Sequence, residues 1–170
     1  MSLFGGENVI YKNDAINTMQ KYLSVLRKLN KWTTENLGNR IGVTKQTISN
    51  LENAKVTMTK TQYIALRCVF ENEVRKATTC RTLKRLFFLF FYSDIEITDE
   101  EHNQLLLVSE SIAAASINGI SNTQLDLMGT TLLSSLKCFM ISNEINFSNN
   151  EPFIWLDNNT MEALNANNQN

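Results

Sequence analysis

The stretch Thr33–Asn53, TTENLGNRIGVTKQTISNLEN, decides how the first half of this chain folds. Two short runs of apolar residues in it recur at helical spacing and can all point inward together. They are Leu37 and Ile41 in the first run, Val43 between the runs, and Ile48 and Leu51 in the second. Gly42 fits a tight turn between the runs, and Gly38 lets the second helix cross closely over the first. The stretch therefore predicts two short helices joined by a turn, the layout of a DNA-binding helix-turn-helix.

The outward face of the second predicted helix is polar and almost free of apolar side chains. It consists of Lys45, Gln46, Thr47, Ser49 and Asn50. Amides, hydroxyls and a cation are the groups that hydrogen-bond to base edges and phosphates. Any one of these residues alone would equally suit an ordinary solvated helix face.

Residues 42–55, GVTKQTISNLENAK, resemble the lambda-repressor-like, Xre-type helix-turn-helix family, especially the lambdoid phage repressors. The resemblance extends back in register through Trp32-Thr33-Thr34 to Arg27, and it covers about residues 14–75. It implies an all-α chain whose residues 13–78 form a five-helix DNA-binding domain. Some domains of this fold bind proteins instead of DNA.

The resemblance also implies roles for individual residues. Base contacts are implied for Lys45, Gln46, Thr47 and Asn50, and sugar-phosphate contacts for Thr34, Asn39, Asn53 and Lys55. Gln46 and Asn50 can each pair bidentately with adenine, and each good base contact contributes about 1–3 kcal/mol of discrimination. The N-termini of the two helices would add partial positive charge and free N–H groups facing the phosphates.

In that family an arginine of the first helix pairs with a glutamate late in the recognition helix, which implies a structural ion pair between Arg27 and Glu52. The sequence departs from the family at two positions. Ala54 stands where glycine usually follows the recognition helix, so either Asn53 takes the left-handed conformation or the turn differs. Gly38 replaces the usual alanine, and a glycine inside a helix costs about 1 kcal/mol. Neither change touches the predicted base-reading face.

The two halves of the chain carry opposite net charges. Residues 1–92 hold 15 Lys/Arg and 6 Asp/Glu, a net charge of +9, whereas residues 93–170 hold 1 and 11, a net charge of −10. The total of −1 therefore hides a basic half, which carries the motif, and an acidic half. Basic surface beside a helix-turn-helix favours binding to nucleic acid, although the charges could also simply solvate two different surfaces.

Helical signals continue on both sides of the motif. Asp14–Asn30 predicts an amphipathic helix, with a flexible arm over residues 1–12 before it. Trp32 precedes the predicted cap Thr33 and is expected to pack on Leu37. Later helices are predicted to start at Thr44 and at the capping boxes Thr59-x-x-Gln62, Thr98-x-x-Glu101 and Ser121-x-x-Gln124.

A further helical pattern spans about Glu73–Tyr92, and its end, LFFLFFY at residues 86–92, is apolar on all sides. A stretch of this kind is most often core, but it also suits a dimer interface or a buried hinge between the two halves. These alternatives are compatible, because obligate dimers bury core between subunits.

The sequence predicts a helical dimerisation or interaction region over residues 79–157 and a disordered tail over residues 158–170. Its last helix keeps a helical period from Leu125 to Phe139, and the apolar island Phe153–Leu156 is expected to dock as a strand or turn. The N-terminus MSLFGGENVI shows no pattern typical of a signal peptide. The longest apolar run is far shorter than the roughly 20 residues needed to span a bilayer.

Catalysis and metal binding find no support in the sequence. Cys68, Cys80 and Cys138 are scattered, which favours reduced, buried thiols in a cytoplasmic protein and no disulfide framework or zinc site. His102 follows the acidic cluster Asp99-Glu100-Glu101, which complements a helix dipole and is expected to leave the histidine at the surface. We therefore expect no enzyme, no cofactor and no metal.

Two functions fit these patterns. The first is a transcriptional regulator, a repressor of bacterial or phage type, that binds double-stranded DNA as a homodimer on a pseudo-palindromic operator. The second is an interaction protein, such as an antitoxin or inhibitor, whose acidic C-terminal half binds a partner protein. The two can coexist, because antitoxins also bind their own operators.

Overall fold

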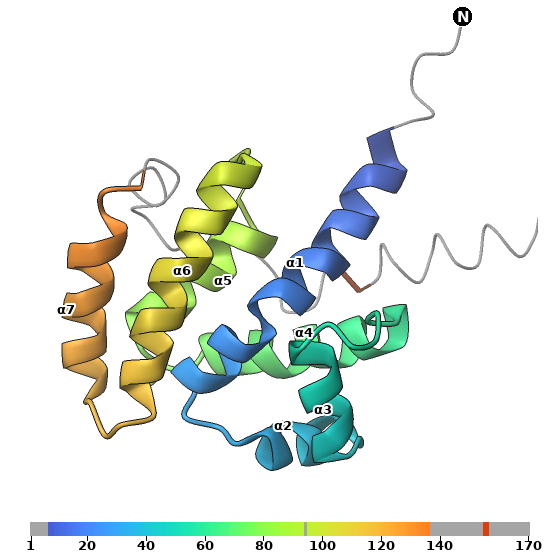
Figure 1. The fold of residues 1–170 in the computed structure, drawn as a ribbon, viewed down its shortest axis with the longest axis horizontal. Coiled ribbons are helices and arrows are strands. Elements are labelled where there is room, and N and C mark those ends of the chain that lie inside the picture. Colours follow the sequence, from blue (N-terminus) through green and yellow to red (C-terminus); the bar gives the residue numbers. More distant parts are fainter. Residues whose placement is uncertain (1–6, 94, 137–154, 157–170) are drawn as a thin grey trace, which may run out of the picture.

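The computed structural model describes residues 7–93, 95–136 and 155–156, and within them the chain is all-helical with no β-strand (Figure 1). The seven helices are α1 Glu7–Leu29, α2 Thr34–Ile41, α3 Lys45–Glu52, α4 Lys60–Val74, α5 Arg81–Phe91, α6 Asp99–Ser116 and α7 Asn122–Leu133. The predicted all-α class is confirmed for this part of the chain. None of these helices has the length and apolar character that crossing a membrane requires.

The predicted helix starts are confirmed by their caps. In four capping boxes the N-cap side chain accepts from the backbone N–H three residues later, and the side chain of that later residue accepts from the N-cap N–H. They pair Thr33 with Asn36, Thr59 with Gln62, Thr98 with Glu101, and Ser121 with Gln124. Thr44 Oγ1 accepts a hydrogen bond of 3.2 Å from the N–H of Thr47 at the start of α3. Each cap satisfies backbone donors that the first turn of a helix leaves unpaired.

The first helix is longer than the sequence pattern predicted. It begins at Glu7, so residues 7–12 are helical where a flexible arm was expected, and residues 1–6 lie outside the described part of the chain. In the sequence two glycines, which are poor helix formers, come directly before this start.

The helix predicted over Glu73–Tyr92 begins eight residues later than expected, at Arg81, because residues 73 and 74 still belong to α4. α4 ends at Val74, and the Thr79 hydroxyl then donates a 2.7 Å hydrogen bond to the carbonyl of Glu73. α5 begins at Arg81 without a side-chain cap from its own N-cap residue. Asp126 of α7 supplies the missing acceptor, because its Oδ1 lies 2.9 Å from the N–H of Thr82. A contact with a distant helix therefore fixes this break.

Helix α1 runs through the middle of the molecule and packs against α3 and α4 on one side and against α5 and α6 on the other (Figure 1). Its core residues Met19, Tyr22, Leu23 and Leu26 are fully buried. The Tyr22 hydroxyl donates a 2.9 Å hydrogen bond to the carbonyl of His102, and the Ser116 hydroxyl donates a 2.5 Å bond to the carbonyl of Lys28. Both halves of the chain thus share α1 as part of one core.

The apolar end of α5 lies in that core. Leu86, Phe87 and Leu89 are buried, and Phe90, Phe91 and Tyr92 pack partly buried against the same cluster. Core, a dimer interface and a buried hinge were the alternatives for this stretch, and the packing within a single chain accounts for core.

The C-terminal part is described only at Trp155 and Leu156, whose backbone is helical where a strand or turn was predicted. Trp155 is 8% exposed, and its indole N–H donates to Glu71, a fully buried residue of α4. The Arg67 guanidinium lies 4.4 Å from the centre of the Trp155 ring. The predicted docking of this island therefore holds for Trp155. The extension of the last helix to Phe139 and the disordered tail fall outside the described residues.

Candidate nucleic-acid interface

Helices α2 and α3 are joined by a tight turn at Gly42, as the sequence predicted. Gly42 has φ 74°, ψ 32°, and its neighbour Val43 donates a 2.9 Å hydrogen bond to the carbonyl of Gly38. A Cβ added to Gly38 would lie 2.6 Å from the Val43 carbonyl oxygen. Such a contact is too close for any side chain, so the approach of the turn to α2 requires glycine at position 38.

The inner sides of the two helices are buried, and α1 holds the end of α3. Leu37, Ile48 and Leu51 are fully buried. The Gln20 side chain donates to the carbonyls of Leu51 and Val56 at 3.0 and 2.7 Å, and its Oε1 accepts from the N–H of Met58 at 2.9 Å. One amide therefore positions both the last turn of α3 and the loop after it. Sequence reasoning missed Gln20, because nothing in its local pattern marks a contact with residues more than 30 positions away.

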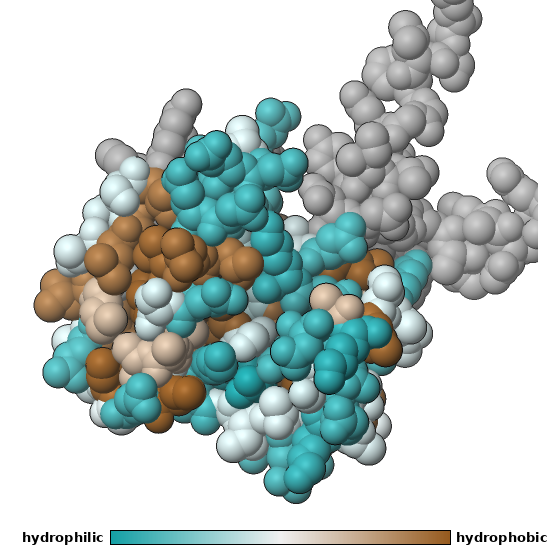
Figure 2. Space-filling model, in the orientation of Figure 1, coloured by the Kyte–Doolittle hydropathy of each residue, from teal (hydrophilic) through white to brown (hydrophobic). Residues whose placement is uncertain are grey.

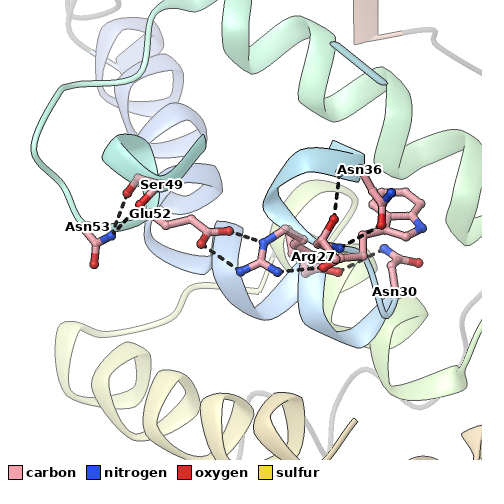
Figure 3. Close-up of polar contacts among 9 residues, drawn as sticks. Arg27, Asn30, Asn36, Ser49, Glu52 and Asn53 are labelled. Carbon is pink, nitrogen blue, oxygen red and sulfur yellow. Dashed lines mark hydrogen bonds and ion pairs between the residues drawn. The ribbon is translucent and has the colours of Figure 1, made fainter. Parts of the chain in front are cut away.

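Arg27 and Glu52 form a bidentate ion pair between α1 and α3 (Figure 3). Arg27 Nε lies 2.6 Å from Glu52 Oε1, and Nη2 lies 3.0 Å from Oε2. Arg27 Nη1 also donates a 2.7 Å hydrogen bond to the carbonyl of Trp32, just before α2. Since Arg27 is 8% exposed, this partly buried pair fixes α1, α3 and the start of α2 relative to one another.

The four residues implied as base contacts all lie on α3. Lys45 and Gln46 are exposed, and Thr47 and Asn50 are half-buried. The Gln46 amide nitrogen donates to Asn50 Oδ1 at 2.9 Å, and the Thr47 hydroxyl lies 3.0 Å from that of Thr44. The two amides are thus held side by side one turn apart, which leaves the Gln46 carbonyl and the Asn50 amino group for an incoming partner.

The residues implied as backbone contacts lie on α2 and in the loop after α3. Thr34 is half-buried as the first residue of α2, while Asn39, Asn53 and Lys55 are exposed. The Asn53 side chain is already engaged, because its Nδ2 donates a 2.8 Å hydrogen bond to the carbonyl of Ser49 (Figure 3). Since α2 packs directly on α3, the structure brings both groups of residues into one compact unit.

The turn after α3 settles which residue takes the left-handed conformation. Ala54 has φ 52°, whereas Asn53 has φ −92°. The N–H of Lys55 reaches back 2.9 Å to the carbonyl of Asn50, and that of Ala54 reaches the carbonyl of Leu51 at 3.2 Å. This is a Schellman-type ending with alanine where glycine is usual, and it fixes the direction in which the chain leaves towards Lys55.

Trp32 has partners that the sequence did not predict. Its ring stacks on Phe70 of α4 at a centroid distance of 5.7 Å, and the Arg40 guanidinium lies 4.0 Å above it. Arg40 is exposed, so this cation–π contact holds a positive charge at the surface of α2. The sequence of α4 contains aromatic residues, but nothing in it indicates that Phe70 stacks on Trp32.

The histidine and two of the cysteines, residues that catalysis or metal binding would use, lie in the packed part of the molecule. His102 is half-buried, not at the surface as expected, and its Nδ1 lies 3.1 Å from the Tyr22 hydroxyl. Burial raises the pKa of the Cys80 thiol and of the half-buried Cys68 thiol, which keeps both protonated. Within the described residues no His, Cys, Asp and Glu cluster of three or more has the geometry of a metal site. Cys138 lies outside them.

Comparison with known proteins adds no relative: no protein-family model, curated protein or solved structure matches the chain.

Proposed function

We propose that this protein is a sequence-specific double-stranded DNA-binding transcriptional regulator, a repressor that acts as a homodimer on a pseudo-palindromic operator. In this proposal residues 13–78 are a lambda-repressor-like domain with α3 as its recognition helix; this range takes in most of α1 and all of α2–α4, and the fifth helix, α5, begins after it at Arg81. The observation that carries it is the contrast between the two sides of α3. Ile48 and Leu51 are fully buried and the helix is braced by Arg27, while the opposite side presents only polar side chains.

The roles of the individual residues follow from their chemistry. The paired amides of Gln46 and Asn50 suit adenine edges in the major groove, and Lys45, in the first turn of α3, suits guanine or a phosphate. Thr34, Asn39, Asn53 and Lys55 would fix register on the sugar-phosphate backbone. The net charge of +9 over residues 1–92 supplies the attraction that such a mode needs. The proposal contains no catalytic step, metal or cofactor.

A salt series tests duplex binding first. The full chain should bind random duplex DNA, with an affinity that falls steeply as salt rises because several phosphates lose their counterions. Absence of duplex binding even at low salt would overturn the proposal.

The face is tested with an operator selected from random sequence. Gln46→Ala with Asn50→Ala should lower the ratio of specific to non-specific affinity by about tenfold or more, since each lost base contact removes about 1–3 kcal/mol. The matched control is Asn103→Ala with Gln104→Ala, an exposed amide pair on α6. An unchanged ratio in the α3 variant would mean that another surface reads the sequence.

A second function is favoured by the acidic half. Glu96, Asp99, Glu100 and Glu110 are all exposed on or just before α6. Such a surface suits a basic protein partner, as in an antitoxin or an inhibitor. Two results together would favour this function over the first. The chain would not bind duplex DNA, and it would bind a basic partner protein in a way that Asp99→Asn with Glu100→Gln abolishes.

A further inference from the structure

An apolar surface lies on the acidic half of the molecule, over α6 and α7. Among the residues that the structure describes, five large hydrophobic side chains are exposed, and four of them belong to α6, its C-cap or α7. These four are Leu107 at 68%, Ile117 at 56%, Leu127 at 69% and Leu132 at 44% exposure. Figure 2 shows the apolar side chains gathered over these two helices. Leucines this exposed and this concentrated are typical of an interaction site.

The same surface is unusually poor in charge. The outward residues of α7 are all uncharged: Asn122, Thr123, Gln124, Leu127, Thr130, Thr131 and Leu132. The single charged residue of this helix, Asp126, is half-buried and accepts the hydrogen bond from Thr82 of α5. On α6 the exposed residues Leu107, Ser111 and Ala114 are uncharged, and Glu110 is the one exposed charge between them. Depletion of charge around apolar residues is the composition of an interface core.

The charge distribution indicates which partner fits this surface. A two-fold interface places a patch opposite the same patch on the other copy, so the carboxylates of an acidic patch would face carboxylates of the other copy. Residues 93–170 carry a net charge of −10, yet the outward face of α7 carries no charged residue, and the exposed carboxylates of the two helices, Asp99, Glu100 and Glu110, all belong to α6. A basic partner protein would instead be drawn to the exposed carboxylates at the start of α6. A surface this poor in charge within a strongly acidic half therefore suits a second copy of this chain.

We propose that the α6–α7 surface, centred on Leu107 and Leu127, is where two copies of this protein meet. Helix α7 lies at the left edge of the molecule in Figure 1, and the recognition helix α3 lies at the lower right beyond α6, α5 and α1, so pairing through α7 leaves α3 of each copy uncovered. In this respect the inference rests on the proposed function, which needs two recognition helices on one operator. The interface itself needs no DNA.

The oligomeric state of the full chain in the absence of DNA tests the interface. Sedimentation equilibrium should find a dimer for the wild type, and Leu107→Glu with Leu127→Glu should weaken dimerisation at least tenfold by placing like charges opposite each other. The matched control is Val56→Glu, since Val56 is also 45% exposed but lies after α3. Circular dichroism checks the fold; if the glutamate variant unfolds, Leu107→Thr with Leu127→Thr takes its place and should weaken the dimer in the same direction.

A wild type that stays monomeric at about 100 µM, or a dimer equally stable in the α6–α7 variant, would overturn the inference. DNA binding separates this failure from failure of the proposed function. A folded monomeric variant should keep weak binding to a half-site and lose the extra affinity of the two-fold operator. If the wild type dimerises through α6–α7 but ignores duplex DNA, the interface stands and the proposed function fails. If the wild type binds the operator but the α6–α7 substitutions leave its dimerisation unchanged, the proposed function stands and the interface is wrong.

Discussion

Ala54 carries a backbone conformation that suits glycine better than alanine. Its φ of 52° places the Cβ close to the following carbonyl oxygen, which costs about 1–2 kcal/mol for a non-glycine residue. The two hydrogen bonds that end α3, from Ala54 and Lys55 to the carbonyls of Leu51 and Asn50, hold it there. The strain therefore lies at the exit from the proposed recognition helix, next to two candidate phosphate contacts.

Ala54→Gly should stabilise the protein by about 0.5–1 kcal/mol, because the relief of backbone strain exceeds the extra freedom that glycine gives to the unfolded chain. Urea denaturation followed by circular dichroism measures the change. Asn53→Gly is the matched control: with φ −92° and a side chain bonded to Ser49, it should destabilise instead. A loss of stability in Ala54→Gly would contradict the assigned strain.

The sequence did not predict this strain: Asn53 was expected to take the left-handed conformation, or the turn to differ, and the structure has Ala54 in that conformation instead. Asn53 tolerates the left-handed region better than alanine, so residue preference alone favoured it over Ala54. The structure explains the outcome, since the Asn53 amide is used to hold the Ser49 carbonyl from within the helical turn. Similarly, Gly38 was identified as a close approach from its place in the motif, but Gln20 was not identified as a clamp, because that role depends on residues far along the chain.

At the scale of helices, the angle between α1 and α3 depends on the pair Arg27 and Glu52. Both side chains are 10% exposed, and the guanidinium keeps a second bond to the Trp32 carbonyl. Removing one partner of such a pair leaves an uncompensated charge with little access to water.

Glu52→Ala should therefore destabilise the protein by about 3 kcal/mol and weaken operator binding through the altered placement of α3. Chemical denaturation gives the first quantity and a titration with operator DNA the second. Glu73→Ala is the control, because its ion pair with Lys76 is a surface pair in which Lys76 is 48% exposed, and it should cost less than about 1 kcal/mol. Equal losses in the two variants would argue against a bracing role for Glu52.

Helix starts were predictable from the sequence and one helix break was not. Thr33, Thr59, Thr98 and Ser121 act within four residues of themselves, so their caps can be found from local sequence alone. The start of α5 depends on Asp126, which is 44 residues away from the backbone N–H that it accepts from. Helical periodicity simply continues through residues 75–80, and only the packing of α7 shows that the chain turns there.

At the scale of the whole molecule, buried tyrosines link stability to alkaline pH. Burial, with the nearby Glu71 carboxylate, raises the pKa of Tyr92 to about 12, and burial also raises that of Tyr63. A raised pKa means that the folded state favours the protonated phenol. The contribution to stability is therefore complete below the ordinary value of about 10 and is lost as the pH rises towards 12.

The thermal midpoint should accordingly fall between pH 10 and 12, which differential scanning calorimetry can follow. Tyr92→Phe removes the hydroxyl whose pKa is raised, so its midpoint should fall less steeply than that of the wild type above pH 10. An identical pH profile for wild type and Tyr92→Phe would show that Tyr92 does not govern the alkaline transition.

The central position of α1 has a consequence for inheritance. Two lineages that recombined between the codons of Thr78 and Thr79 would exchange coding segments but not complete cores, because Tyr22 and Lys28 of one parent would have to bond His102 and Ser116 of the other. Chimaeras would fold only where these facing positions had stayed compatible. The proposed reading helix and the proposed pairing surface would then pass from ancestor to descendant together, and a change in one would always be tested by selection in the presence of the other.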